Sequence, residues 1–405
     1  MAARSIHELD LPSLRDTGVG ALDPAAIQAS WQHHWLSRTP LGFAVTRHED
    51  VFAVLRDRRF HSASSRLAKM PGDDEDYLGS LPRSLLSMDG NEHSRLRRLV
   101  SPAFTPKAAD RLRPYMREVI NALVDSVAAS GRCEFVGDLC DPYPVPIICR
   151  LLGAPTQDSK IFSQWATDIH RKFNNNLAAD LPVIRRATEE LKDYVRAMID
   201  ERRTTPTNDL ISELIAVEEQ GDRLSTEELV TMAELILMAG TDTTRNQLAC
   251  SVAVLAEHPD QWALLGQRPE LAAQAVDETM RHLGALRGTL RFAAEDIEYR
   301  DVLFPRGTLL WTSAVGANMD PSVWEAPETF DITQKRSIQH LTFGSGIHYC
   351  LGASLARAEL QEALALLARR MPGLTLDGPV DWQPSNVGIW GPARLRLRFQ
   401  PDVRA

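Results

Sequence analysis

The chain has 405 residues, of which 44% are hydrophobic and 24% are charged, and its formal net charge at pH 7 is −9. This composition allows a sizeable core and argues against a disordered protein, while the acidic balance argues against nucleic acid or an anionic membrane as a partner. No stretch has the composition of a linker and no internal repeat occurs, so we expect a single domain over residues 1–405.

The N-terminal segment 1–12 mixes charged and polar residues and has no apolar core. No window approaches the ~20 continuous apolar residues that a membrane span needs. We therefore expect a cytoplasmic protein with no signal peptide and no membrane anchor. The cysteines lack Cys-x-x-Cys spacing, so neither a disulfide framework nor a zinc site is expected. Cys133, Cys140, Cys149 and Cys250 lie among apolar neighbours, as core residues do, whereas Cys350 does not.

Helical periodicity dominates the chain. Apolar residues recur at a spacing near 3.6 in segments that predict helices, namely 95–101, 106–130, 158–174, 181–204, 208–220, 226–257, 271–283 and 351–370. Shorter alternating segments predict strands over 43–46, within 290–304, over 308–315 and over 394–399. Long loops are predicted over 62–86, 174–180 and 316–341. The fold class that follows is mainly α, a large helical domain with small β-sheets.

The predicted helix 226–257 begins with a capping box and ends before a proline. Its centre, residues 239–244, contains residues that an apolar helix usually avoids. Gly240 costs up to about 1 kcal/mol of helix stability, and Asp242 places a carboxylate among apolar residues. Thr243 can bond back to the helix backbone and bend it. The segment is either a functional site or a polar surface stripe with a packing glycine.

Cys350 lies in the segment Phe343-Gly-Ser-Gly-Ile-His-Tyr-Cys-Leu-Gly352, next to the predicted helix 351–370. Gly344 and Gly346 permit backbone conformations that are closed to other residues. A helix N-terminus stabilises a thiolate through its unpaired N–H groups and its dipole. Gly352 leaves the first turn open to a flat group. The arrangement suits a thiolate bound to the metal of a planar cofactor; the alternative is a buried structural cysteine beside an ordinary turn.

The segment 343–352 and the helix after it resemble the haem-binding loop of bacterial cytochrome P450 enzymes. This resemblance implies the cytochrome P450 fold, haem b (iron protoporphyrin IX) as the cofactor and Cys350 as the ligand of its iron. It also implies that Phe343 packs beside the sulfur, and that Gly344 and Gly352 belong to the cofactor-binding loop.

Residues 239–244 resemble the centre of the helix that crosses the opposite face of the haem in this family. By this resemblance, Ala239 and Gly240 leave room for dioxygen. Asp242 and Thr243 resemble the catalytic acid–alcohol pair that delivers protons during oxygen activation.

His93 and Arg97 are spaced i, i+4 and share one helix face, where they would suit an anionic carboxylate. A solvated surface charge is the ordinary explanation for each of them. The resemblance implies instead that they bind the haem propionates, together with Arg291 and His348. The motifs follow one another in the family's order between about residues 88 and 390.

Glu278 and Arg281 are spaced i, i+3, as in many surface ion pairs. In the family that this chain resembles, such a pair is buried and supports the haem loop. An Arg or His before a following Phe usually joins the pair as a third partner. This chain has Thr329 at that place, and Lys335 and Arg336 are the candidates to replace it.

The resemblance implies a monooxygenase that inserts one oxygen atom from dioxygen into a lipophilic small-molecule substrate, by hydroxylation or, as a variant, epoxidation. The substrate would contact residues 62–86, 173–177, 236–239, 288–290 and 387–390. The alternatives are a peroxide-driven peroxygenase and a non-catalytic haem-thiolate sensor. The pair of Asp242 and Thr243 argues against the peroxygenase, because such relatives replace it.

No flavin or dinucleotide module fits after residue 399. Electrons are therefore expected from NAD(P)H through an external reductase and a ferredoxin or flavodoxin-type donor. An acidic ferredoxin would dock near Cys350, attracted by Arg97, Arg98 and Arg357. We expect a monomer.

Overall fold

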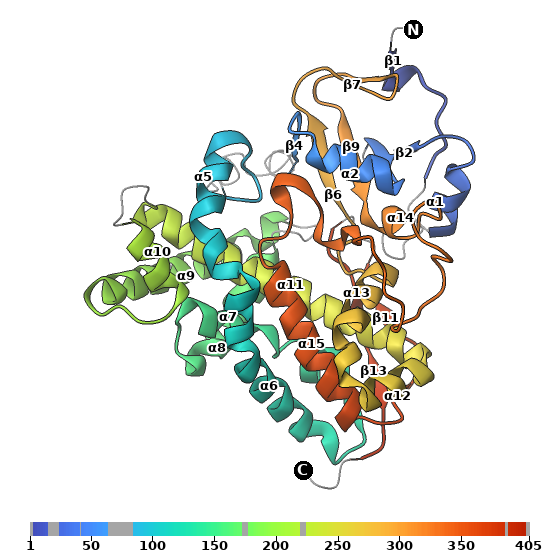
Figure 1. The fold of residues 1–405 in the computed structure, drawn as a ribbon. Coiled ribbons are helices and arrows are strands. Elements are labelled where there is room, and N and C mark those ends of the chain that lie inside the picture. Colours follow the sequence, from blue (N-terminus) through green and yellow to red (C-terminus); the bar gives the residue numbers. More distant parts are fainter. Residues whose placement is uncertain are drawn as a thin grey trace.

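The computed structural model describes residues 3–14, 24–40, 42–63, 84–171, 177–218, 224–384 and 388–401, and Figure 1 shows their arrangement. The helices are α1 (Pro24–Ser30), α2 (His48–Arg56), α5 (Gly90–Val100), α6 (Pro106–Ala128), α7 (Pro144–Leu152), α8 (Ser159–His170), α9 (Leu177–Thr204), α10 (Leu210–Glu218), α11 (Thr226–Glu257), α12 (Pro259–Gln267), α13 (Ala272–His282), α14 (Ala314–Asn318) and α15 (Ala353–Arg370). The strands are β1 (Arg4–Ser5), β2 (Leu36–Thr39), β3 (Gly42–Val45), β4 (Phe60–Ser62), β5 (Arg132–Glu134), β6 (Gly288–Ala293), β7 (Ile297–Tyr299), β8 (Val302–Phe304), β9 (Leu309–Ser313), β10 (Thr375–Leu376), β11 (Asp381–Trp382), β12 (Pro392–Arg394) and β13 (Arg396–Arg398). The predicted mainly α fold class with small sheets is confirmed.

The longest helix, α11, has the bounds predicted from its capping signals. The Ser225 hydroxyl accepts from the Glu228 N–H at 3.2 Å, and the Ser225 N–H donates to Glu228 Oε2 at 2.7 Å. This capping box gives hydrogen-bond acceptors to two backbone N–H groups at the helix start, those of Ser225 and Glu228. Behind it, α11 packs against α7, α9 and α15, and α15 runs beside α6 (Figure 1). The helix therefore brings its central residues 239–244 into the helical core.

Five helices were not predicted, namely α1, α2, α7, α12 and α14. Helix α7 shows the reason, because it has only nine residues and contains two prolines, Pro144 and Pro146, which are unfavourable inside a helix. Pro144 occupies its first turn, where no N–H is needed, and Gly153 ends it with φ 89° in the left-handed region. Its buried apolar residues include Ile147 and Ile148, and the helix packs against α11.

The largest sheet has five strands in the order β2-β3-β9-β6-β4. It joins distant parts of the chain, since Phe43 of β3 lies opposite Leu310 of β9 in a parallel pair. Strand β6 is antiparallel to both β9 and β4, with Arg291 opposite Leu310 and Ser62. The sheet lies at one end of the helical part, above the N-terminal end of α15 (Figure 1). None of the helices in the described ranges is both long and apolar enough to cross a membrane.

Candidate functional site

Backbone geometry closes the loop 343–352 ahead of α15. The Cys350 N–H donates to the Phe343 carbonyl oxygen at 2.9 Å. Gly344 and Gly346 have φ of 69° and 70°, a region that glycine adopts without strain. A Cβ on Gly346 would also overlap the Leu55 carbonyl oxygen of α2. Both conformation and close contact therefore require glycine at residue 346.

The opposite side of this loop is open. A Cβ placed on Gly352, the residue before α15, would meet no described atom within 4 Å. A Cβ on Gly344 would be 4.0 Å from its nearest neighbour, the His348 carbonyl oxygen. Open space is thus present next to Gly344 and Gly352, which precede and follow Cys350 in the chain, and a flat group could lie there.

The surroundings of Cys350 act on its thiol in opposite directions. Burial raises the pKa of Cys350, while a hydrogen bond from the Gly352 backbone and the charges of Arg97 and Arg357 lower it. Burial outweighs the others, so the thiol is neutral unless a cation binds to the sulfur. In the described part of the chain, no three His, Cys, Asp or Glu side chains are grouped to hold a metal ion. A metal bound to Cys350 would therefore take its further ligands from a cofactor.

Phe343 is held by Arg357 of α15, which also contacts α13 and Tyr349. The Arg357 guanidinium carbon lies 4.4 Å from the Phe343 ring centroid. Its Nε donates to Asp277 Oδ1 of α13 at 3.0 Å, and Nη1 donates to the Tyr349 hydroxyl at 3.3 Å. Two helices therefore hold the buried Phe343 in place.

Three of the predicted propionate-binding residues meet where α5 packs against the loop 343–352. Arg97 Nη2 donates to the Tyr349 carbonyl oxygen at 2.5 Å, and the His93 and His348 ring centroids are 4.6 Å apart. His348 Nε2 lies 3.1 Å from Asp89 Oδ1. His93 is 1% exposed, and neither of its ring nitrogens has a hydrogen-bond partner. Burial, followed by the charges of His348 and Arg97, lowers the pKa of His93 to about 4. A buried imidazole in this state indicates a missing partner.

Arg291 joins this group from β6. It is buried, and Nη1 donates to the Leu290 carbonyl oxygen at 3.0 Å. Burial lowers the pKa of Arg291 to about 10, against the attraction of Asp89. A cluster of buried basic groups with few acidic partners would be stabilised by added carboxylates.

The centre of α11 opens at two residues on one face. Ala239 is exposed and Thr243, one turn later, is partly exposed, although Thr241 and Thr244 are buried. The Thr243 hydroxyl donates to the Ala239 carbonyl oxygen at 2.6 Å, so its oxygen can still accept a hydrogen bond. The Asp242 side chain is 34% exposed. Ala239, Asp242 and Thr243 therefore keep accessible surface at the centre of a helix whose neighbouring residues are mostly buried.

Gly240 has a different environment from Ala239. A Cβ on Gly240 would lie 2.5 Å from Cδ1 of Ile148 in α7. The glycine therefore allows α7 and α11 to pack closely, which is the packing alternative left open by the sequence. Asp242 lies 3.9 Å from Nη1 of Arg245, which also pairs with the half-exposed Asp141. This chain of charges connects the middle of α11 with the protein surface.

Arg336 is the third partner of Glu278 and Arg281. Arg281 donates to both Glu278 oxygens at 2.8 Å, and Arg336 donates to them at 2.8 and 3.0 Å. Thr329 contributes its carbonyl oxygen, 3.0 Å from Arg281 Nη2. This buried network of hydrogen bonds joins the segment 327–336 to α13.

Two residues of the site were missed by the sequence reasoning. Asp89 contacts His348, and Glu359 is buried in α15, where burial raises its pKa to about 8 against a hydrogen bond with Thr244. The available signal for Glu359 was an acidic residue on the apolar side of a helix. The predicted substrate contacts at 64–83, 173–176 and 387 lie outside the described residues.

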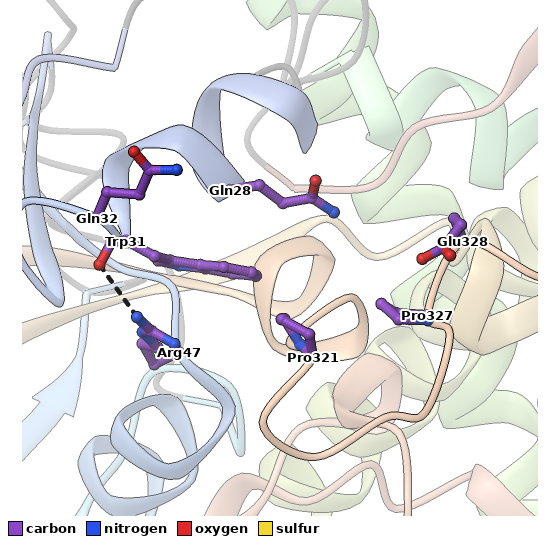
Figure 2. A pocket seen from close by; sticks show the side chains of 7 residues that line it. All are labelled: Gln28, Trp31, Gln32, Arg47, Pro321, Pro327 and Glu328. Carbon is purple, nitrogen blue, oxygen red and sulfur yellow. Dashed lines mark hydrogen bonds between the residues drawn. The ribbon is translucent and has the colours of Figure 1, made fainter.

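Two of the hollows lined by described residues lie at different places relative to the predicted site. One, of about 350 Å³, is lined by Gln28, Trp31, Gln32, Arg47, Pro321, Pro327 and Glu328 and contains none of the predicted site residues (Figure 2). The other, of about 160 Å³, lies between α5 and the first half of α11, where it meets Thr231 and Leu235. Leu235 lies about one helical turn before Ala239, and neither Ala239 nor Thr243 lines this cavity.

Comparisons with known proteins agree with this geometry. The family model for cytochrome P450 matches residues 157–267 and 260–372. The chain is 35% identical to luteothin monooxygenase of Streptomyces thioluteus over 96% of both chains. It is 39% identical to mycinamicin IV hydroxylase/epoxidase of Micromonospora griseorubida, over 84% of this chain and 86% of that protein. The crystal structure of cytochrome P450 MoxA from Nonomuraea recticatena superimposes with a TM-score of 0.84, at 33% identity over 96% of this chain and 98% of that one. The chain therefore belongs to the cytochrome P450 family of haem-thiolate oxidoreductases.

Proposed function

We propose that this protein is a monooxygenase that uses haem b to insert one oxygen atom from dioxygen into a lipophilic small molecule. Hydroxylation is the proposed reaction, epoxidation is a variant, and residues 1–405 form one haem-binding domain. The observation that carries the proposal is the closed Cys350 loop beside the buried, unpartnered ring of His93. Similarity to relatives named as a monooxygenase and a hydroxylase/epoxidase supports the reaction class.

Haem fits the chemistry of these residues. Cys350 would hold the iron, whose positive charge would offset the cost of a buried thiolate, and Gly344 and Gly352 leave open space in the same loop. The propionates would supply the partners that the His93 ring nitrogens lack and the negative charge that the buried Arg291 lacks, with Arg97 and His348 close by. When bound, haem supplies the iron at which dioxygen is activated for transfer of one oxygen atom.

Asp242 and Thr243 are the proposed catalytic residues. The Thr243 hydroxyl faces the open side of α11 and can hold a proton-carrying hydrogen bond there, since its own hydrogen goes to the Ala239 carbonyl. Asp242 is next to Thr243 in the chain and pairs with Arg245, which also pairs with the half-exposed Asp141. A carboxyl in this place can pass protons inward while the surrounding buried residues exclude bulk water.

Electrons are proposed to come from NAD(P)H through an external reductase and a ferredoxin or flavodoxin-type donor. Arg97 and Arg357 are engaged inside the protein, with Tyr349 and with Asp277. Arg98 is exposed on α5 and is the better candidate to attract an acidic donor.

Turnover with ¹⁸O₂ tests the proposal. Lipophilic compounds that shift the spin state of the haem are first selected, then supplied with NAD(P)H, reductase and ferredoxin. The product should contain one ¹⁸O atom per molecule. Oxygenation by hydrogen peroxide without any turnover by reductase and ferredoxin would favour the peroxygenase, and binding without product by either route would favour the sensor.

A further inference from the structure

Arg287 is a buried cation without a counter-charge. The residue is 5% exposed, and its Nε is enclosed without a hydrogen-bond partner. Burial lowers the pKa of Arg287 to about 10. The group that acts against this shift is Cys250, a thiol whose own pKa is raised by burial, and not a carboxylate. Among the described residues, no Asp or Glu forms an ion pair with Arg287.

Two other buried arginines among the described residues are paired with a carboxylate, whereas Arg291, in the predicted propionate-binding group, is not. Arg281 is held by Glu278, and Arg202 donates to Asp209 at 2.7 Å and to a backbone carbonyl. An unpaired buried guanidinium is costly, so it persists where a ligand supplies the missing charge. Arg287 therefore differs from the arginines that stabilise the fold.

The backbone places Arg287 on the same side of the sheet as Arg291. The Arg287 N–H donates to the Gly388 carbonyl at 2.9 Å, and Leu286 forms a bridge with Ile389, so this segment extends β6. Side chains alternate along a strand, so Arg287 shares a face with Arg291, four residues and about 13 Å away. This face contains the propionate-binding cluster at one end and Arg287 toward the other.

The Arg287 guanidinium lies over one aromatic ring, that of Trp390. Its central carbon lies 5.1 Å from the Trp390 ring centroid, and Trp390 stacks on Trp382 with centroids 4.4 Å apart and planes at 10°. The Trp390 indole N–H donates to the Gln383 carbonyl oxygen at 2.9 Å. A planar, pre-oriented guanidinium matches the two oxygens of a carboxylate.

We propose that Arg287 binds a carboxylate of the substrate, and that the protein therefore acts on lipophilic carboxylic acids. This inference rests on the proposed monooxygenase function and names its substrate class. Arg287 is a specificity-determining residue that positions the acid end of the molecule, so that the apolar part lies over the open face of α11.

Iron-binding probes test this without a known substrate. ω-(Imidazol-1-yl)alkanoates of graded chain length and their methyl esters are titrated into the ferric protein, and the shift of the Soret band gives each Kd. At one or more chain lengths, the acid should bind about ten- to one hundred-fold more tightly than its ester. Arg287→Gln should remove this preference and leave the affinity for the esters unchanged. Arg287→Lys should keep part of it, since the charge remains without the planar fork.

Arg306→Gln is the matched control, because Arg306 is an exposed arginine before β9. It should retain the full preference for acids. Equal binding of acids and esters in the unaltered protein, or an equal preference in Arg287→Gln, overturns the inference. A loss of haem from Arg287→Gln also overturns it, because Arg287 would then serve a propionate. Failure of imidazole itself to shift the Soret band would instead refute the proposed haem function.

Discussion

Arg336 donates two hydrogen bonds to Glu278, from a segment that lies more than fifty residues along the chain. Burial acts to raise the pKa of Glu278, but the bonds from Arg281 and Arg336 outweigh it and lower the pKa. The carboxylate therefore stays charged inside the protein and binds the segment 327–336 to α13.

Removal of Arg336 tests this network. Arg336→Ala should lower the free energy of unfolding by about 1–3 kcal/mol, because two charge-assisted hydrogen bonds to a buried carboxylate are lost. Lys335→Ala, at the exposed neighbouring position, should change it by less than about 0.5 kcal/mol. Urea unfolding of both variants measures the difference. Equal effects of the two substitutions would remove Arg336 from the network.

Two glycines of the Cys350 loop should respond differently to alanine. Gly346→Ala should destabilise the haem-free protein by about 1–3 kcal/mol, because of its positive φ and its contact with Leu55. Gly352→Ala has open space and a negative φ, so it should leave the haem-free fold within about 0.5 kcal/mol but weaken haem binding. Urea unfolding and transfer of haem to apomyoglobin separate the two effects. Normal haem retention in Gly352→Ala would show that the open space belongs to something else.

His93 should make the stability of the haem-free protein depend on pH. Its pKa falls from the ordinary 6.5 to about 4 on folding, so the unfolded chain binds the extra proton between these values. Stability is fully present above pH 6.5 and is lost as the pH falls toward 4, by at most about 3 kcal/mol. His93→Leu should remove this part of the pH dependence in urea unfolding at pH 7.5 and 5. An unchanged slope would mean that His93 is not the group that titrates.

Thr243→Ala should separate electron consumption from product formation. The variant should bind haem normally but release more hydrogen peroxide and form several-fold less product per NAD(P)H, because the hydroxyl at the open face of α11 is gone. Thr241→Val is the control, since the Thr241 hydroxyl is buried and bonds to the Leu237 carbonyl oxygen at 3.0 Å. Unchanged coupling in Thr243→Ala, or an equal loss in Thr241→Val, would contradict the role of Thr243.

Local signals were sufficient for the elements that carry the motifs. The capping box at Ser225 and the proline after His258 gave the bounds of α11, and the glycines around Cys350 indicated its turn. The β3–β9 pairing was not predictable, because it joins residues about 270 positions apart through the global topology. Helix α7 was missed because it is short and contains two prolines.

The sequence indicated which residues belong to the site more readily than it indicated which of them lie together in space. His93, Arg291 and His348 come from three different elements, and only a resemblance suggested that they meet. The choice between Lys335 and Arg336 depends on which side chain turns inward. That Arg287 has no acidic partner among the described residues could not be predicted, because the sequence does not show which side chains pack around it.

The carbon monoxide spectrum of the reduced protein tests the central claim that Cys350 holds haem iron as a thiolate. The haem-loaded ferrous protein with carbon monoxide should show the red-shifted Soret band of thiolate coordination. Cys350→His should retain a fold and lose that band. A fully haem-loaded, folded protein without the red-shifted band would contradict the account.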